Sequence, residues 1–127
     1  LGQTCADGNS GTFHSDESID AIVVNTRSGN DFGAGEAVEL AVTIWAWNAS
    51  NDTVDLFHAA DASQPVWTHL DTIRPAQSGA STLRYAYTLP SGANRQAFRA
   101  AIRLNGTSAE CTNGSYDDHD DLAISLR

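Results

Sequence analysis

An acidic run near the end of the chain is the stretch whose residue types point most directly to chemistry. It places four carboxylates within five residues, just before the short apolar segment 122–126. Carboxylates this close repel one another unless a cation or dense solvation offsets their charge, and their oxygens are ligands that Ca²⁺ favours. We therefore expect a structural calcium ion that joins the two ends of the chain; a solvated acidic turn is the alternative. The candidate ligands are Asp117, Asp118, Asp120, Asp121, Glu17 and Asp20.

Other metal motifs are not indicated by the spacing of the possible ligands. A loop counted from Asp117 or Asp118 lacks the glycine at the sixth position and the glutamate at the twelfth position of an EF-hand. The four histidines show no zinc-binding pattern such as His-Glu-x-x-His. The sequence therefore favours calcium over zinc.

Cys5 and Cys111 are the only cysteines, and both lie in polar, glycine-rich segments. We predict that they form a disulfide, which would close a loop of about a hundred residues and stabilise the fold by roughly 4 to 5 kcal/mol in the chain-entropy model. Two unrelated free thiols are the alternative. A disulfide implies an oxidising compartment, so we expect a secreted, extracellular protein. Because the sequence shows no initiating methionine, signal peptide or transmembrane run, we expect a mature protein or an excised module.

Six aromatic and cationic side chains are candidates for ligand binding. They are Trp45, Trp47, Trp67, Arg84, Arg99 and Arg103. Tryptophans on a sheet face stack against sugar rings in many carbohydrate-binding modules, although a register shift of one residue would turn the same rings into the core. The three arginines should form the one basic patch of a chain without lysine, and their guanidinium groups suit an acidic polysaccharide. Cross-strand pairing with nearby acids is the alternative that we favour for them.

The net charge of −9 argues against nucleic acid and anionic membranes as partners. It arises from sixteen acidic residues against seven arginines, whereas both of these partners need clustered positive charge. No catalytic constellation is evident. The chain has no Gly-x-Ser-x-Gly elbow and no phosphate-cradling glycine loop before a helix, and its carboxylates cannot be assigned to a hydrolytic pair from sequence. We therefore expect a protein that is not itself an enzyme.

Seven short strands would have to position these residues. The expected strands are 19–24, 36–47, 53–59, 66–73, 83–89, 95–104 and 121–126. In the second of them, alternate residues are apolar and should face the core: Val38, Leu40, Val42, Ile44 and Ala46. We expect the second and third strands to form an antiparallel hairpin. The segment 95–104 suits a helix or a strand equally, and we assign it to a strand because short strands at even spacing surround it.

The pattern predicts one all-β domain that spans residues 1–127. Residues 1–16 have no apolar periodicity, so they should form an irregular lead-in held by the disulfide. Seven strands and no convincing helix predict an antiparallel β-sandwich of immunoglobulin-like or jelly-roll type. A closed barrel is the competing architecture.

Three segments taken together resemble a known group of domains. They are 54–67, 87–92 and 111–122, and the Tyr-Asp-Asp-x-Asp-Asp-Leu ending of the third is the most specific. The resemblance is to accessory β-sandwich domains that are appended C-terminally to secreted bacterial hydrolases, especially extracellular proteases and polysaccharide-degrading enzymes. It runs from about Ile19 to the end of the chain. It implies a non-catalytic, oxidised, calcium-stabilised module whose parent enzyme lies N-terminal to Leu1.

Two functional hypotheses follow. In the first, the module binds a polysaccharide through its tryptophans and arginines and so holds a covalently attached hydrolase near its substrate. In the second, it is a structural, secretion-related or substrate-binding domain of an extracellular protease and has no glycan ligand. A free-standing lectin or small enzyme is a weaker third hypothesis.

Overall fold

The computed structural model describes residues 18–104 and 118–127, and the structural statements below concern these ranges. Four residues singled out from the sequence lie outside them, namely Cys5, Glu17, Cys111 and Asp117. The disulfide therefore stays a prediction, and so does the part that Glu17 and Asp117 would play in binding calcium.

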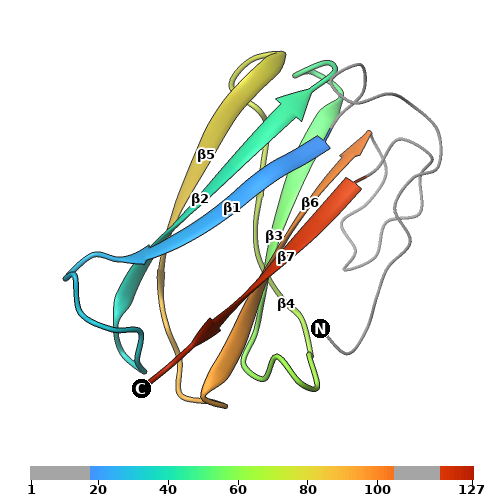
Figure 1. Ribbon diagram of the computed structural model, residues 1–127. Helices are drawn as coiled ribbons and strands as arrows, with labels where there is room; N and C mark the ends of the chain where they lie inside the picture. Colours follow the sequence, from blue (N-terminus) through green and yellow to red (C-terminus); the bar gives the residue numbers. More distant parts are fainter. Residues whose placement is uncertain (1–17, 105–117) are drawn as a thin grey trace.

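Seven strands and no helix make up the described ranges (Figure 1). They are β1 (Ser18–Thr26), β2 (Ala37–Ala46), β3 (Asp52–Ala59), β4 (Thr68–Ile73), β5 (Gly79–Thr88), β6 (Arg95–Leu104) and β7 (Asp118–Ser125). The assignment of 95–104 to a strand is confirmed with its bounds unchanged. The last strand begins at Asp118, three residues before the predicted start, so three of the four carboxylates of the acidic run are paired with β6. No helix of these ranges is long and apolar enough to cross a membrane.

The strands form two antiparallel sheets that face each other (Figure 1). One sheet has three strands in the order β1-β2-β5, and the other has four in the order β4-β3-β6-β7. The predicted β-sandwich is confirmed, and the described strands do not form the competing closed barrel. Six of the strands are distributed as in immunoglobulin-like sandwiches, where the first, second and fifth share one sheet; β4 instead extends the sheet beside β3.

The core between the sheets follows the alternation of β2. Val38, Val42 and Ile44 are 0% exposed, and the whole predicted core set of this strand is buried. Leu56, Phe98 and Ile102 approach it from the four-stranded sheet. Because alternate residues of a strand point to opposite faces, the intervening residues of β2 point outward. The periodicity therefore predicts both the core of this sheet and its outer face.

The two central strands of the four-stranded sheet, β3 and β6, are buried on both faces. All eight residues of β3 are buried, and residues 96–103 of β6 are buried as well. A second apolar cluster accounts for part of this on the outer side, where Phe57, Trp67 and Ala101 pack together. The expected contrast between a core face and a solvent face therefore fails for these two strands.

The predicted hairpin between the second and third strands is wrong. β2 pairs with β1 and β5, whereas β3 pairs with β4 and β6, so the turn after β2 carries the chain from one sheet to the other. A short polar turn between two strands fits a hairpin and a crossing between sheets equally well. The choice depends on which other strands each one pairs with, and alternation along the chain does not contain that information.

Candidate functional site

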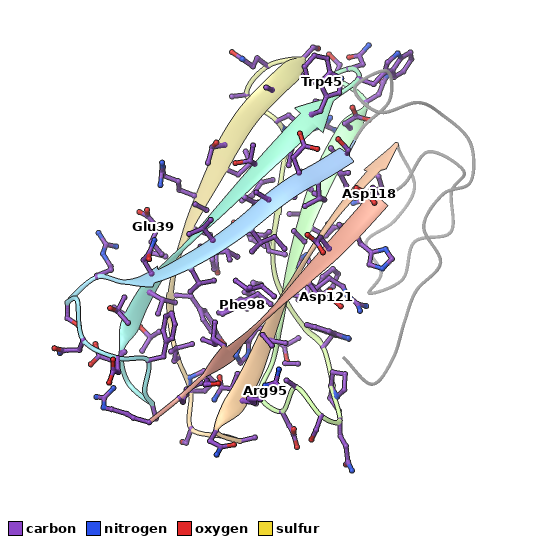
Figure 2. The ribbon with its side chains drawn as sticks, in the orientation of Figure 1. Glu39, Trp45, Arg95, Phe98, Asp118 and Asp121 are labelled. Carbon is purple, nitrogen blue, oxygen red and sulfur yellow. The ribbon has the colours of Figure 1, made fainter. Side chains whose placement is uncertain are left out.

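The acidic run is divided between the two faces of β7. Asp118 and Asp120 lie opposite Ile102 and Ala100, so they share the inward-facing side of this strand. Asp118 accepts a hydrogen bond of 2.8 Å from the backbone N–H of Ile19, which joins the last strand directly to the first (Figure 2). The first and last strands are thus joined through a carboxylate and a backbone amide.

Asp121 points to the other face and is held by an arginine. Its Oδ1 and Oδ2 accept hydrogen bonds of 2.7 and 2.8 Å from Nε and Nη2 of Arg99. A carboxylate engaged at both oxygens by a guanidinium fork is a poor calcium ligand. Among the predicted ligands that the structure describes, Asp118, Asp120 and Asp20 remain suited to a cation. Their carboxylates are hard oxygen donors, and they lie near the starts of β7 and β1.

These three carboxylates do not by themselves form a recognisable metal centre. Within 18–104 and 118–127, no group of three or more histidine, cysteine or acidic side chains is arranged to hold a metal ion. Asp120 is exposed, and its Oδ1 accepts a hydrogen bond from the backbone N–H of Asp121. Asp20 accepts one from the Ser18 hydroxyl. The fit of this end of the sandwich to calcium is therefore partial, and calcium stays a prediction.

The three arginines do not form a single patch, contrary to the sequence expectation. Arg84 lies on the outer face of the three-stranded sheet, whereas Arg99 and Arg103 lie on the outer face of the four-stranded sheet. The reason is that β5 and β6, although consecutive in the chain, belong to different sheets. Each arginine pairs with an acid of its own sheet, at 2.9 Å for Arg84 with Glu39 and 2.7 Å for Arg103 with Asp55. The cross-strand pairing is confirmed.

Trp67 is not available for stacking against a sugar. It is 9% exposed and packs in the second apolar cluster with Phe57 and Ala97. The Arg99 guanidinium lies 4.4 Å from the centre of its ring, within the range of a cation–π contact. Because Arg99 is itself 1% exposed, this pair belongs to the packed outer side of the four-stranded sheet.

A buried acid, a threonine and a histidine come together beside this cluster. The Thr72 hydroxyl donates to Asp55 Oδ1 at 2.7 Å, and His69 Nε2 lies 2.8 Å from Thr72 Oγ1. Since the single hydroxyl proton goes to Asp55, the histidine nitrogen donates to the threonine oxygen. A nucleophile activated by a base needs the opposite arrangement, in which the hydroxyl donates to the histidine. This cluster therefore supports packing of the sheet.

The remaining two tryptophans lie at one end of the three-stranded sheet. Trp45 points outward from β2 and is half-buried, and its ring lies 3.8 Å from where a Cβ on Gly79 would be (Figure 2). Trp47 follows the last residue of β2 and is 52% exposed, which makes it one of three large apolar side chains exposed in the described ranges. The sequence prediction that the ring opposes the core face is confirmed for Trp45, whereas Trp47 lies beyond the end of β2 and is exposed.

The surface that extends from Trp45 is the outer face of the three-stranded sheet. We define it by eleven residues that point away from the core, namely Ala21, Val23, Asn25, Glu39, Ala41, Thr43, Trp45, Ala80, Thr82, Arg84 and Ala86. The members from β1 and β5 are exposed and those from the central β2 are half-buried. The hydroxyls of Thr43 and Thr82 lie 3.3 Å apart across the strands. Glu39 and Arg84 are the only charged members, and they pair with each other.

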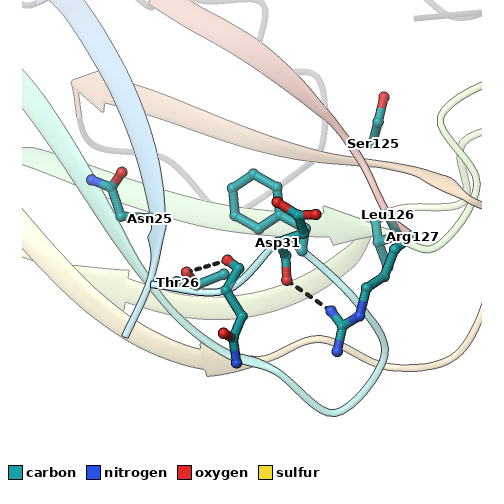
Figure 3. A pocket seen from close by; sticks show the side chains of 8 residues that line it. Asn25, Thr26, Asp31, Ser125, Leu126 and Arg127 are labelled. Atoms are coloured by element: carbon teal, nitrogen blue, oxygen red, sulfur yellow. Dashed lines mark hydrogen bonds between the residues drawn. The ribbon is translucent and has the colours of Figure 1, made fainter. Parts of the chain in front are cut away.

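A cavity of about 370 Å³ opens beside the other end of this face (Figure 3). It lies between the end of β1, the loop that follows it and the residues after β7, and Asn25 lines the cavity as well as the outer face. Arg127 forms one wall, where Nη1 donates to the backbone oxygen of Asp31 at 2.8 Å and Nη2 contacts Glu36 at 3.2 Å. Gly33 lies against this guanidinium, and a Cβ there would require the flexible Arg127 side chain to move.

Glu36 lies beside this cavity, where its carboxylate contacts Arg127. A hydrogen bond from the Ser28 hydroxyl is the main cause that holds the pKa of Glu36 below its usual value, and Asn30 and Arg127 act in the same direction. The cavity could not be found from the sequence, because its walls come from segments about a hundred residues apart.

A polar cluster inside the sandwich was also missed by the sequence analysis. His58 is 3% exposed, and its Nε2 lies 2.8 Å from Oε1 of Gln96, which is fully buried. The Gln96 amide nitrogen donates to the backbone oxygens of Pro90 and Ala93, so its oxygen accepts from His58. Burial lowers the pKa of His58, and burial raises the pKa of Tyr87, whose ring lies 5.1 Å from it. The cluster holds the loop between β5 and β6 in place.

Comparison with protein-family models and with curated protein sequences gives no match for this chain.

Proposed function

We propose that this chain is a non-catalytic accessory module that binds carbohydrate through the outer face of its three-stranded sheet and serves a secreted hydrolase. The observation that carries the proposal is two tryptophans at one end of the three-stranded sheet, Trp45 on its outer face and Trp47 just beyond the end of β2. Trp47 exposes 52% of its surface, and the Trp45 ring lies 3.8 Å from where a Cβ on Gly79 would be. An indole at the surface of a sheet offers a flat apolar face with a polar N–H at its edge, so these two side chains are the candidates for stacking against a ligand.

The chemistry of the face suits sugars. A pyranose ring has an apolar face of C–H groups that stacks on an indole, and its hydroxyls need donors and acceptors beside that ring. Thr43 and Thr82 supply hydroxyls, Asn25 supplies an amide, and Glu39 supplies a carboxylate, all on the same side of the sheet. Trp67, Arg99 and Arg103 leave the proposed ligand set because they are buried.

Retention in affinity gels tests the proposal. The gels would contain alginate, agar, chitin, cellulose or xylan, and at least one should retard the wild-type chain. Trp47→Ala and Trp45→Ala should each weaken that retardation without unfolding, since both rings lie at the surface of the sheet. Val66→Ala is the matched control, because Val66 is 81% exposed but lies just before Trp67, beside the four-stranded sheet. Unchanged mobility of the wild type in all five gels would overturn the proposal.

A further inference from the structure

We infer that the ligand of the outer face is a neutral, extended glycan chain that lies along β2, from the tryptophan end to the cavity beside Asn25. This inference rests on the proposed function and deepens it, because it fixes the charge class of the polymer and the path that it follows. Three properties of the described residues carry it: the charge of the face, its length and the size of its side chains.

The charge of the face argues for a neutral polymer. The face has one acid and one base, and they pair at 2.9 Å, so its net charge is zero in a chain whose net charge is −9. An acidic polysaccharide would be repelled by the field of the whole molecule. It would also need free guanidinium groups, but Arg99 and Arg103 are buried with Asp121 and Asp55 on the opposite sheet. A neutral chain meets neither obstacle.

The length of the face argues for a chain of several sugar units. Trp45 and Glu39 lie near opposite ends of β2 (Figure 2), and six residues at about 3.4 Å each separate them by ~20 Å. Asn25 lies directly across from Glu39 on β1, and it also lines the cavity of about 370 Å³. A ligand that contacts both the indoles and this end must therefore span the sheet.

The middle of the face has small side chains that let a chain approach the sheet. Ala41 lies between Val23 on β1 and Arg84 on β5, and Thr43 lies between Ala21 and Thr82. The Thr43 and Thr82 hydroxyls are 3.3 Å apart, a long contact that leaves each oxygen able to bond a sugar hydroxyl as well. On β2 itself, Ala41 and Thr43 are the outward-facing residues between Glu39 and Trp45, and both are small, whereas the larger Val23 and Arg84 flank them on β1 and β5.

Calorimetric titration with hexasaccharides of known charge tests the inference on the full chain. The neutral probes are the β-1,4-linked hexamers of glucose, xylose and N-acetylglucosamine, and the anionic probe is an alginate hexamer. At least one neutral hexamer should bind more tightly than its own trimer by about tenfold or more. Its affinity should stay nearly constant in about 1 M NaCl, where the Debye length is only about 3 Å.

One variant tests the middle of the path independently of the tryptophan end. Ala41→Gln places an uncharged side chain in the middle of the path and should reduce hexamer binding by about tenfold while leaving trimer binding nearly unchanged. Val66→Gln, an exposed position beside the other sheet, is the matched control.

The possible outcomes distinguish this inference from the proposed function. Preferred binding of the alginate hexamer, lost in high salt or in Arg84→Gln, would overturn the inference and keep a carbohydrate-binding module. Equal binding of trimer and hexamer would overturn the path along β2, and so would an Ala41→Gln variant that binds the hexamer like wild type. Either result would still keep a carbohydrate-binding module. Failure of every glycan to bind would overturn both.

Discussion

His58 is a histidine placed where a charge is costly. It lies between the two sheets with its imidazole against the rings of Tyr87 and Phe98, each centred 5.1 Å away. Its Nε2 is committed to Gln96, and its Nδ1 lies 3.4 Å from the Tyr87 hydroxyl, so Tyr87 is the titratable side chain that faces it. None of these partners carries a negative charge that would stabilise the imidazolium. Burial therefore keeps the pKa of His58 below its usual value of 6.5.

This position predicts that stability decreases in mild acid. Because the pKa of His58 is lower in the folded state, the unfolded state binds more protons below about pH 6.5. The contribution to the free energy of unfolding is therefore complete above that pH and is lost as the pH falls toward the folded-state pKa. Urea unfolding at a series of pH values should show a smaller acid-side decrease for His58→Gln than for wild type.

A core substitution without a titratable group is the control for this experiment. Ile44→Val should lower the free energy of unfolding by about 0.5 to 1.5 kcal/mol at every pH, because it removes only buried apolar volume. Parallel curves for wild type and His58→Gln between pH 7 and pH 5 would contradict the role assigned to burial.

At the scale of the elements, the loop between β5 and β6 joins several segments at one end of the sandwich. Its backbone at Leu89 exchanges hydrogen bonds with the loop after β1, Ala93 donates to Ala60, and Asn94 accepts from Leu126. Gly92 lies where this loop passes closest to the turn after β3. A Cβ there would be 2.8 Å from the backbone oxygen of Ala60, closer than non-bonded atoms normally approach.

Gly92→Ala should therefore destabilise the fold. Where space permits, such a change stabilises by about 0.4 to 1 kcal/mol through the unfolded state, but here the loop must move away from Ala60. We expect a loss of about 1 to 3 kcal/mol in the free energy of unfolding, the usual range for overpacking. Ser91→Ala, at an exposed neighbouring position, should change it by less than about 0.5 kcal/mol. A Gly92→Ala variant as stable as wild type would show that the loop adapts at no cost.

The strands also differ in how much of their structure could be predicted from the sequence. Alternation in β2 located the core set and the outward direction of Trp45, because a strand with one buried face shows its period in the sequence. It could not locate Trp67 or the pairing of β3, since both depend on what covers the outer side of the four-stranded sheet. Asp55 and Arg103 look like solvent-facing residues in the sequence, yet they are 0% and 8% exposed as a pair.

For the whole molecule, the meeting of the first and last strands is the feature on which calcium would act. Asp118 already bonds to the backbone of Ile19, and Asp120 and Asp20 lie on the same two strands. A cation bound among these carboxylates would stabilise only the folded state, by about 2.7 kcal/mol at a hundredfold excess over its Kd. We therefore expect the Tm of chelator-treated protein to rise when Ca²⁺ is added.

Two variants assign this rise to the acidic run. Asp120→Ala should remove most of the calcium-dependent increment in Tm, and Asp118→Ala should also lower the Tm without calcium because the Ile19 amide loses its acceptor. Asp31→Ala, an exposed acid in the loop after β1, should leave the increment intact. A wild-type Tm that is the same with chelator and with Ca²⁺ would remove calcium from the description of this fold.

The burial of β3 and of residues 96–103 of β6 has a kinetic consequence. Amide protons that water cannot reach from either side exchange with deuterium only when a large part of the domain opens, so those of β3 and β6 should be the slowest in the chain. The amides of β1 and β5, at the edges of the three-stranded sheet, should exchange through smaller openings. The face proposed for ligand binding would then be the deformable half of the molecule, supported by a rigid half behind it.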